Sequence, residues 1–349
     1  MLPSGWIVLV AERFADLPGT VLPWTWGAAV AGVLAALVVF AVPTMLRSPV
    51  LSAVACLALA VLLLRPGVLA GWPPPGWIVV ACDVGQGDAL VLRAGAHAAV
   101  VVDTGPDPTA VDRCLDDLEV SSVPAVVISH FHADHVGGTA GVGAGRDVGV
   151  VVIGPHDEPQ EQADELRRWA RTHRVEVVVA EPGQRTRVGD VWWTVLGPTR
   201  IIRSVGSTPN QASVVLRAEV DGVSVLLTGD IEPAAQRALG RGPDLDVDIL
   251  KVPHHGSADQ DPAFLEATSP AVAIVSVGAD NTYAHPGAGT IAALEAMGAT
   301  VLRTDTDGDL AVVADPDEPG RSGLSLVRRR RQRSAGDRAP PTAMACSPA

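Results

Sequence analysis

From residue 76 onward, short runs of apolar residues alternate with polar and turn-forming segments. Runs of about four to eight residues rich in Val, Ile and Leu are typical of buried strands. Longer segments with apolar residues at helical spacing lie between these runs and predict helices. We therefore expect an α/β domain with two sheets and helices outside them. The expected strands cover residues 78–82, 89–92, 98–102, 125–128, 148–153, 175–180, 191–196, 213–220, 223–227, 247–252, 271–277 and 300–302, and the expected helices cover residues 109–118, 160–172, 232–239, 262–268 and 288–297.

The first 75 residues contain two long apolar runs without charged residues, at residues 27–45 and 50–64. Their lengths approach the roughly 20 residues that span a bilayer, and tryptophans flank the pair, as is typical of membrane interfaces. We predict that residues 1–75 form a membrane region, with an interfacial segment and then a transmembrane hairpin of helices near residues 27–45 and 50–70. The alternative is a pair of buried helices in a soluble protein. It is disfavoured because adjacent uncharged runs of this length are rare in soluble domains.

The C-terminal residues 323–349 are rich in Arg, Pro and Ala and predict a disordered tail, which leaves residues 76–322 for the globular domain. The formal net charge of −13 at pH 7 argues against a broadly basic nucleic-acid-binding protein. The four cysteines show neither an even-spaced framework nor a Cys-x-x-Cys motif. We therefore expect small buried side chains there, with no structural zinc site.

The most informative segment for chemistry is residues 130–135, which read His-Phe-His-Ala-Asp-His after a predicted strand. Side chains alternate along an extended chain, so His130 and His132 share one side. Asp134 and His135 fall on the following turn and can face a second point. This pattern predicts a metal site and favours two ions over one. The alternative is a solvated polar loop that happens to be rich in His.

Other polar residues follow predicted strands in the same way, namely Asp103, Asp230 and the pair His254 and His255. The ends of such strands meet at one edge of an α/β core, so we expect these side chains to lie near the metal site. Each of these signals alone is weak, but together, in this order along the chain, they are a strong signal for a site. Lys251 is the only lysine of the chain. It either contacts a phosphate or holds the strand end through an ion pair.

Several segments resemble motifs of the metallo-β-lactamase superfamily and, more narrowly, of the C-terminal hydrolase domain of the ComEC family of DNA-uptake proteins. The resemblance covers about residues 77–315 and implies a four-layer αβ/βα sandwich. Ala284 stands where the ComEC family usually has Gly. Asn210, as in that family, stands where many other superfamily members have His. The segments that carry the resemblance are residues 83–89, 102–105, 129–138, 210–213, 227–230, 250–257 and 281–286.

These residues suggest a hydrolytic centre with two divalent ions, zinc or manganese, as a hypothesis. A hydroxide between the ions would attack phosphorus. Because an amide is a poor zinc ligand, Asn210 predicts a weaker first site or a preference for a harder ion such as manganese. The expected metal ligands are His130 and His132 for the first ion, Asp134 and His135 for the second, Asp230 as the bridge, and His255, rather than His254, to complete the second site.

The remaining candidates surround this centre. Asp103 is expected to orient a ligating His, and His254 to contact the substrate or leaving group. Asp134, Asp230 and His254 are the candidate catalytic residues. The candidate substrate contacts are Ser257, Asn281 and His285.

The resulting functional hypothesis is a membrane-anchored, metal-dependent phosphodiesterase or nuclease that acts on single- or double-stranded DNA during uptake. Its expected partners are DNA, the lipid bilayer and further membrane subunits or copies, since two spans are too few to form a DNA channel. If Arg47 is cytoplasmic, the hydrolase domain faces outward from the cell membrane. One alternative is a hydrolase of a small phosphodiester or another ester. The other is a non-catalytic transport component, against which the intact histidine cluster weighs.

Overall fold

The computed structural model describes residues 71–330, except residues 204–205, 241–243, 316 and 319. The chain divides into two compact units, Met1–Pro75 and Gly76–Ala349. The predicted membrane spans at residues 27–45 and 50–70 lie outside the described residues and stay a prediction. Within the described part, no helix has the length and apolar character that crossing a membrane requires.

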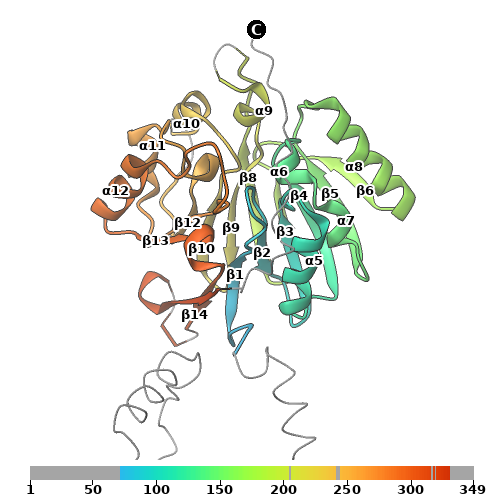
Figure 1. Cartoon of the computed structure of the whole chain (residues 1–349), viewed down its shortest axis with the longest axis horizontal. Coiled ribbons are helices and arrows are strands. Elements are labelled where there is room, and N and C mark those ends of the chain that lie inside the picture. Colours follow the sequence, from blue (N-terminus) through green and yellow to red (C-terminus); the bar gives the residue numbers. More distant parts are fainter. Residues whose placement is uncertain (1–70, 204–205, 241–243, 316, 319, 331–349) are drawn as a thin grey trace, which may run out of the picture. The chain divides into compact units, whose positions relative to one another are not determined.

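Two sheets stack in the centre of the second unit (Figure 1). The strands β3 to β6 pair in parallel, and so do β10 to β13, while the other pairs are antiparallel. From edge to edge, the first sheet consists of β15 (Leu324–Arg329), β14 (Asp309–Ala314), β1 (Trp77–Ala81), β2 (Leu90–Arg93), β3 (Ala98–Val102), β4 (Ser122–Ile128), β5 (Asp147–Ile153) and β6 (Glu176–Val179). The second consists of β13 (Thr300–Arg303), β12 (Val272–Val275), β11 (Ile249–Lys251), β10 (Val223–Leu227), β9 (Val215–Val220), β8 (Val191–Gly197) and β7 (Arg185–Val188).

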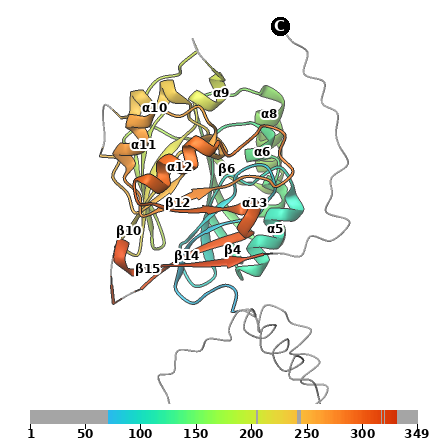
Figure 2. The ribbon, with the colours of Figure 1, turned by 60° about the vertical axis from the view of Figure 1, so that its left-hand side comes forward.

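Helices cover the outer faces of both sheets, as Figures 1 and 2 show from two directions. Two of them begin at an aspartate whose carboxylate accepts a hydrogen bond from a backbone N–H of the first turn, Asp107 from Thr109 and Asp261 from Phe264. Along the first sheet lie α5 (Pro108–Asp117), α6 (Ala133–Val136), α7 (Thr139–Val142) and α8 (Gln160–His173). Along the second lie α10 (Pro233–Leu239), α11 (Pro262–Thr268) and α12 (Ala288–Ala296). The short elements are α9 (Thr208–Gln211), α13 (Thr304–Asp307), η1 (Pro253–Gly256) and η2 (Arg321–Gly323).

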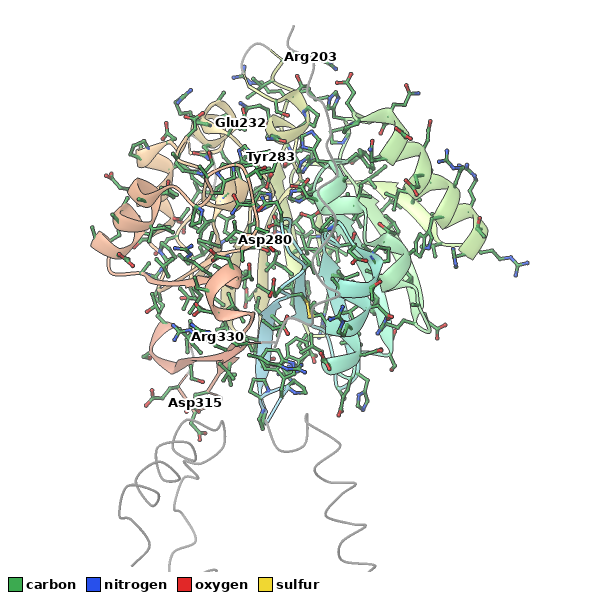
Figure 3. The ribbon with its side chains drawn as sticks, in the orientation of Figure 1. Arg203, Glu232, Asp280, Tyr283, Asp315 and Arg330 are labelled. Atoms are coloured by element: carbon green, nitrogen blue, oxygen red, sulfur yellow. A yellow bond between two sulfur atoms is a disulfide. The ribbon has the colours of Figure 1, made fainter. Side chains whose placement is uncertain are left out.

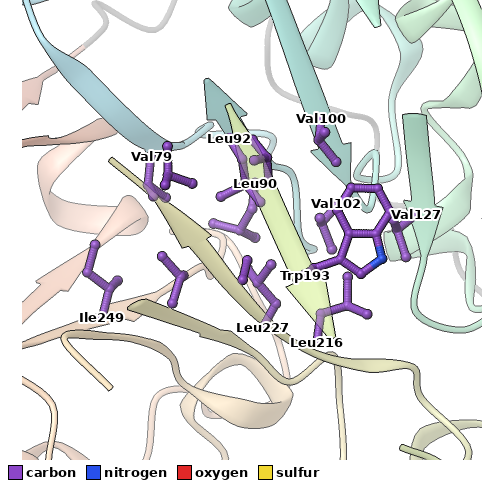
Figure 4. Packing of buried hydrophobic residues seen from close by; sticks show 14 of the residues in the cluster. Val79, Leu90, Leu92, Val100, Val102, Val127, Trp193, Leu216, Leu227 and Ile249 are labelled. Atoms are coloured by element: carbon purple, nitrogen blue, oxygen red, sulfur yellow. The ribbon is translucent and has the colours of Figure 1, made fainter. Parts of the chain in front are cut away.

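The core lies between the two sheets, where Trp193 and Leu216 of the second sheet face Val102 and Val127 of the first (Figure 4). Along β10, alternate residues such as Leu227 point into this core, whereas Leu226 packs among the residues of α10, α11 and α12. Both faces of the strand are therefore buried. This explains why its sequence reads as a continuous apolar run rather than an alternating one.

The predicted two sheets with outer helices are confirmed. The apolar pattern missed β7, β14 and β15. The last of these corrects the predicted disordered tail, because Leu324–Arg329 pairs antiparallel with β14 and packs Leu324 and Leu326 against the core. The arginines of β15 interrupt the alternation of apolar and polar residues that would predict a strand. The tail residues 331–349 lie outside the described part.

Two of the cysteines are buried as expected, but they also form a disulfide that was not predicted, between Cys82 and Cys114. Cys82 directly follows β1, and Cys114 lies in α5. Both side chains are buried. The bond therefore ties the start of the loop after β1 to a helix that the sequence places 32 residues away. Sequence spacing did not indicate it, since only the fold brings these two segments together.

Candidate metal centre

Polar residues from four strand ends meet at one edge of the two sheets. Asp103 follows β3 and residues 130–135 follow β4, both in the first sheet. Asp230 follows β10 and His255 follows β11, both in the second sheet. Because these strands are parallel neighbours within each sheet, their carboxyl ends deliver all these side chains to the same place.

Four side chains form the metal-ligating cluster, which we define as Asp134, His135, Asp230 and His255. Their ligand atoms lie within 4.8 Å of one another. The Nε2 of His255 lies 3.3 Å from Oδ2 of Asp134, and 3.2 Å from Oδ2 of Asp230. The Nε2 of His135 lies 3.2 Å from the same oxygen of Asp230. Among the described residues, neither of these buried Nε2 atoms has a hydrogen-bond partner. Two imidazole nitrogens that converge on carboxylate oxygens and form no hydrogen bond fit a divalent cation.

The Nδ1 atoms of His135 and His255 each have a hydrogen-bonding partner. The Nδ1 of His135 lies 2.9 Å from Oδ2 of Asp103. The hydroxyl of Ser129 donates to the same oxygen, and the backbone N–H of Ser129 donates to Oδ1 of Asp103. The Nδ1 of His255 lies 2.9 Å from the carbonyl oxygen of Ser276, to which it can donate. Such partners set the tautomer and aim Nε2 at the cluster. Asp103 thus lies where the sequence analysis expected it, behind a candidate ligand.

His130 and His132 lie beside the cluster and face each other, with Nε2 of His130 3.0 Å from Nδ1 of His132. Within the described ranges, neither belongs to a group of three or more side chains that could hold a metal. Asn210 is buried, and its Nδ2 donates to Oε1 of Glu232 at 3.1 Å. The donors expected for the first ion are therefore gathered less completely than those for the second.

The charged groups of the cluster stabilise one another despite their burial. Burial alone disfavours a charge on His135, but the carboxylates of Asp230 and Asp103 outweigh it and raise the pKa of this imidazole well above its usual value. For His255, burial is likewise outweighed, by Asp230 and Asp88, so its pKa is also raised. Burial favours the neutral acid of Asp230, yet the two imidazoles hold its pKa well below the usual range. A bound cation would take the place of these protons.

Lys251 lies beneath the cluster and forms a buried ion pair with Asp88. Its Nζ donates to the carbonyl oxygen of Gly229 at 3.0 Å and lies 3.5 Å from Oδ1 of Asp230. Of the two roles considered for this lysine, the structure shows the ion pair.

Asp88 is the residue of this region that the sequence analysis missed. Besides Lys251, its carboxylate lies 3.3 Å from Nδ1 of His255 and 3.6 Å from Nδ1 of His135. The sequence did contain a signal for Asp88. This residue directly follows Gly85-Gln86-Gly87 between two strands, where glycines allow the backbone to approach other segments closely. Indeed, a Cβ on Gly87 would lie 2.1 Å from the carbonyl oxygen of Asp134.

The remaining predicted residues lie on loops beside the cluster. His254 and His255 both have positive φ, 50° and 52°, a strained backbone that is typical of functional sites in residues other than Gly. The ring of His254 lies 5.2 Å from that of His285, between centroids. The hydrogen bonds that the structure gives Ser257 through its hydroxyl and Asn281 through its side chain stay within their own loops.

Residues 82–278 match the family described as the metallo-beta-lactamase superfamily, and this match spans more than half of the chain. The chain belongs to this superfamily. Membership and the His/Asp cluster together support a metal-dependent hydrolase.

The chain is similar in sequence to two curated bacterial proteins. Over 249 residues, 65% of the chain, it is 27% identical to ComE operon protein 3 of Bacillus subtilis (strain 168), and the match covers 32% of that protein. Over 306 residues, 81% of the chain, it is 29% identical to Competence protein ComA of Neisseria gonorrhoeae, and the match covers 40% of that protein. The predicted resemblance to the ComEC family is confirmed, although the chain matches less than half the length of either relative.

The chain is also similar to solved structures, at low sequence identity. One is the metallo-beta-lactamase fold protein YhfI from Bacillus subtilis, with 12% identity and a TM-score of 0.42. It covers 64% of this chain and 95% of its own.

Proposed function

We propose that this protein is a metal-dependent phosphodiesterase that cleaves DNA at the membrane during DNA uptake. The observation that carries the proposal is the metal-ligating cluster, with its two Nε2 atoms aimed at shared carboxylates. The similarity to proteins named for competence supports DNA as the substrate.

In this proposal, Asp134, His135 and His255 would hold one ion, His130 and His132 would hold a second, and Asp230 would serve as a ligand for both. Bound zinc or manganese ions supply an activated water at neutral pH and positive charge that stabilises the transition state at phosphorus. Asp103 keeps Nε2 of His135 directed at the cluster, and Ser276 does so for His255. The weaker gathering of donors around His130 supports an asymmetric centre, in which the second ion binds less tightly.

The ring of His254 lies 5.2 Å from that of His285 and 6.2 Å from that of His255, a member of the cluster, between centroids. Burial lowers the pKa of His285, with His254 adding to the effect, so this imidazole is neutral at neutral pH. A neutral imidazole can accept or donate a hydrogen bond to a substrate oxygen. We assign His254 and His285 to contacts with the phosphodiester and its leaving group.

The membrane anchor and its sidedness belong to the same proposal. The apolar runs at residues 27–45 and 50–64 support a hairpin in the cell membrane. The buried disulfide between Cys82 and Cys114 supports a hydrolase domain on the outer side, because disulfides persist in oxidising compartments. Channel formation then requires other subunits or copies.

The decisive experiment incubates the purified full chain with single- and double-stranded DNA after loading with manganese or zinc. We expect cleavage with at least one metal and none after chelation. If the protein hydrolyses a small phosphodiester but cleaves neither DNA, the proposed substrate is the small phosphodiester and not DNA. No turnover of any phosphodiester would favour the non-catalytic alternative.

Matched variants tie the activity to the cluster. We expect Asp230→Asn to lose at least about a hundredfold in kcat, in line with losses at groups that act directly in catalysis. Asp221→Asn is the control, since Asp221 is exposed and pairs with Arg93 on β2. Full activity of Asp230→Asn would contradict the assignment of the cluster.

A further inference from the structure

Tyr283 is an exposed aromatic side chain on the loop that also carries His285. It is the only tyrosine of the chain, and 67% of its surface is accessible. Among the described residues, the exposed large apolar side chains are Val179, Trp192 and Tyr283. A single exposed aromatic residue is common on protein surfaces. The exposure of Tyr283 therefore indicates a binding role only in combination with the position of the residue.

The loop that carries Tyr283 is braced internally by one side chain. The Nδ2 of Asn281 donates to the carbonyl oxygens of Gly278 and His285, at 2.7 and 2.9 Å. The Oδ1 of the same residue accepts from the backbone N–H groups of Tyr283 and His285, both at 3.2 Å. This hydrogen-bonded loop presents the exposed ring in a defined place rather than on a free chain.

A series of aromatic rings leads from Tyr283 to the cluster. The Tyr283 ring is nearly parallel to that of His285, at 16° with centroids 6.0 Å apart. The ring of His285 lies 6.5 Å from that of His255, a member of the cluster. Figure 3 labels Tyr283 among the side chains of the described residues. Tyr283 is thus separated from a candidate metal ligand by a single imidazole.

An exposed ring at this position suits a substrate that carries flat groups next to its phosphates. Nucleobases stack on aromatic side chains at about 1–3 kcal/mol per base, and this stacking tolerates any sequence because every base has a π-face. The face of Tyr283 that does not meet His285 is available for such a contact. The chain as a whole is strongly acidic, so stacking offers affinity that does not depend on a basic surface.

We propose that Tyr283 stacks on a nucleobase of a single-stranded nucleic acid whose phosphodiester lies at the metal-ligating cluster. The proposal rests on the phosphodiesterase function proposed above and names the part of the substrate that is recognised. In this arrangement Tyr283 binds a base of any identity, whereas the His and Asp residues act on the phosphate. The hydrogen bonds of the loop order the Tyr283 ring before the substrate binds. Stacking of a base therefore costs little conformational entropy and does not rearrange the site.

The test compares two single-stranded oligonucleotides of equal length on the manganese-loaded full chain. One carries bases throughout, and the other carries abasic residues. With the base-containing strand, Tyr283→Ala should raise KM about tenfold or more and leave kcat nearly unchanged. Tyr283→Phe retains the ring and should keep the wild-type KM. With the abasic strand, wild type and Tyr283→Ala should behave alike.

Trp192→Ala is the matched control, because Trp192 is also exposed, at 50%, but lies on β8 and packs with Arg187. Loss of kcat in Tyr283→Phe would overturn the stacking role in favour of a catalytic hydroxyl. An unchanged KM in Tyr283→Ala, or an equal rise with the abasic strand, would overturn it as well.

Failure of this inference is distinguishable from failure of the proposed function. If the wild-type chain cleaves neither strand, the phosphodiesterase proposal fails first. Fluorescence anisotropy with the same two strands then tests stacking alone. Binding that depends on both the bases and Tyr283 supports the subsite, and binding indifferent to Tyr283 rejects it.

Discussion

Lys251 forms a buried ion pair with Asp88 directly beneath the candidate metal centre. The same ammonium lies 3.5 Å from Asp230, and the Asp88 carboxylate lies 3.3 Å from Nδ1 of His255. Burial opposes the charge of Lys251, but Asp88 and Asp230 outweigh it and raise its pKa above the usual value. A permanent positive charge is thus fixed among the carboxylates, where it stabilises their ionised form.

Replacing Lys251 with Met should destabilise the fold by about 3–5 kcal/mol, because one partner of a buried ion pair is removed and Asp88 loses its main counter-charge. The free energy of unfolding measured by urea denaturation checks this expectation. The double variant Lys251→Met/Asp88→Asn should lose less than the sum of the two single variants. Strict additivity in this cycle would show that the two residues do not interact.

Metal binding should raise the stability of the folded chain. At a free metal concentration of a hundred times Kd, we expect a gain of about 2.7 kcal/mol in the free energy of unfolding, which chelation reverses. Calorimetric unfolding with manganese and with zinc measures it. Asp230→Asn should abolish the gain, whereas Asp221→Asn should keep it. A gain of equal size in Asp230→Asn would place the ion elsewhere.

The disulfide between Cys82 and Cys114 should contribute about 2–4 kcal/mol, since it closes a loop of considerable length in the unfolded chain. Urea denaturation with and without a reductant should show this loss in the wild type. The double variant Cys82→Ala/Cys114→Ala should be less stable from the start and insensitive to the reductant. Alkylation of all four cysteines in unfolded, unreduced protein would disprove the bond.

Two glycines in the loop before Asp88 separate backbone strain from close contact. A Cβ at Gly85 meets nothing within 4 Å, so Gly85→Ala should cost only about 1–2 kcal/mol, from its positive φ. A Cβ at Gly87 would lie 2.1 Å from the carbonyl oxygen of Asp134. Gly87→Ala should therefore cost more stability and also weaken metal affinity, measured by isothermal titration. Equal effects of both variants would mean that this contact does not position Asp134.

The candidate site could be predicted from the sequence as far as each residue follows its own strand. His135, Asp230 and His255 come directly after strongly apolar runs, and parallel strands carry such residues to one edge. Asp88 follows no comparable pattern, since its role depends on contacts with Lys251 and two imidazoles from distant segments.

The fold shows the same division between local and distant interactions. Strands buried on both faces, such as β4 and β10, produce continuous apolar runs and were predicted. The edge strands β7 and β15 contain arginines and exposed residues. Their sequences therefore do not reveal that these segments pair with a neighbouring strand. The Cys82–Cys114 bond was missed for a related reason, because it joins a strand end to a helix that packs beside it only in the folded domain.

The sequence by itself determined the family, the two-sheet architecture and which His and Asp residues lie at strand ends, because these properties depend on local pattern and strand order. The tertiary structure decided which donors converge. It gathered Asp134, His135, Asp230 and His255 into one cluster, left His130 and His132 beside it and facing each other, and turned Lys251 toward Asp88. Convergence depends on side-chain directions and distances between segments far apart in the chain, and these become defined only when the two sheets pack.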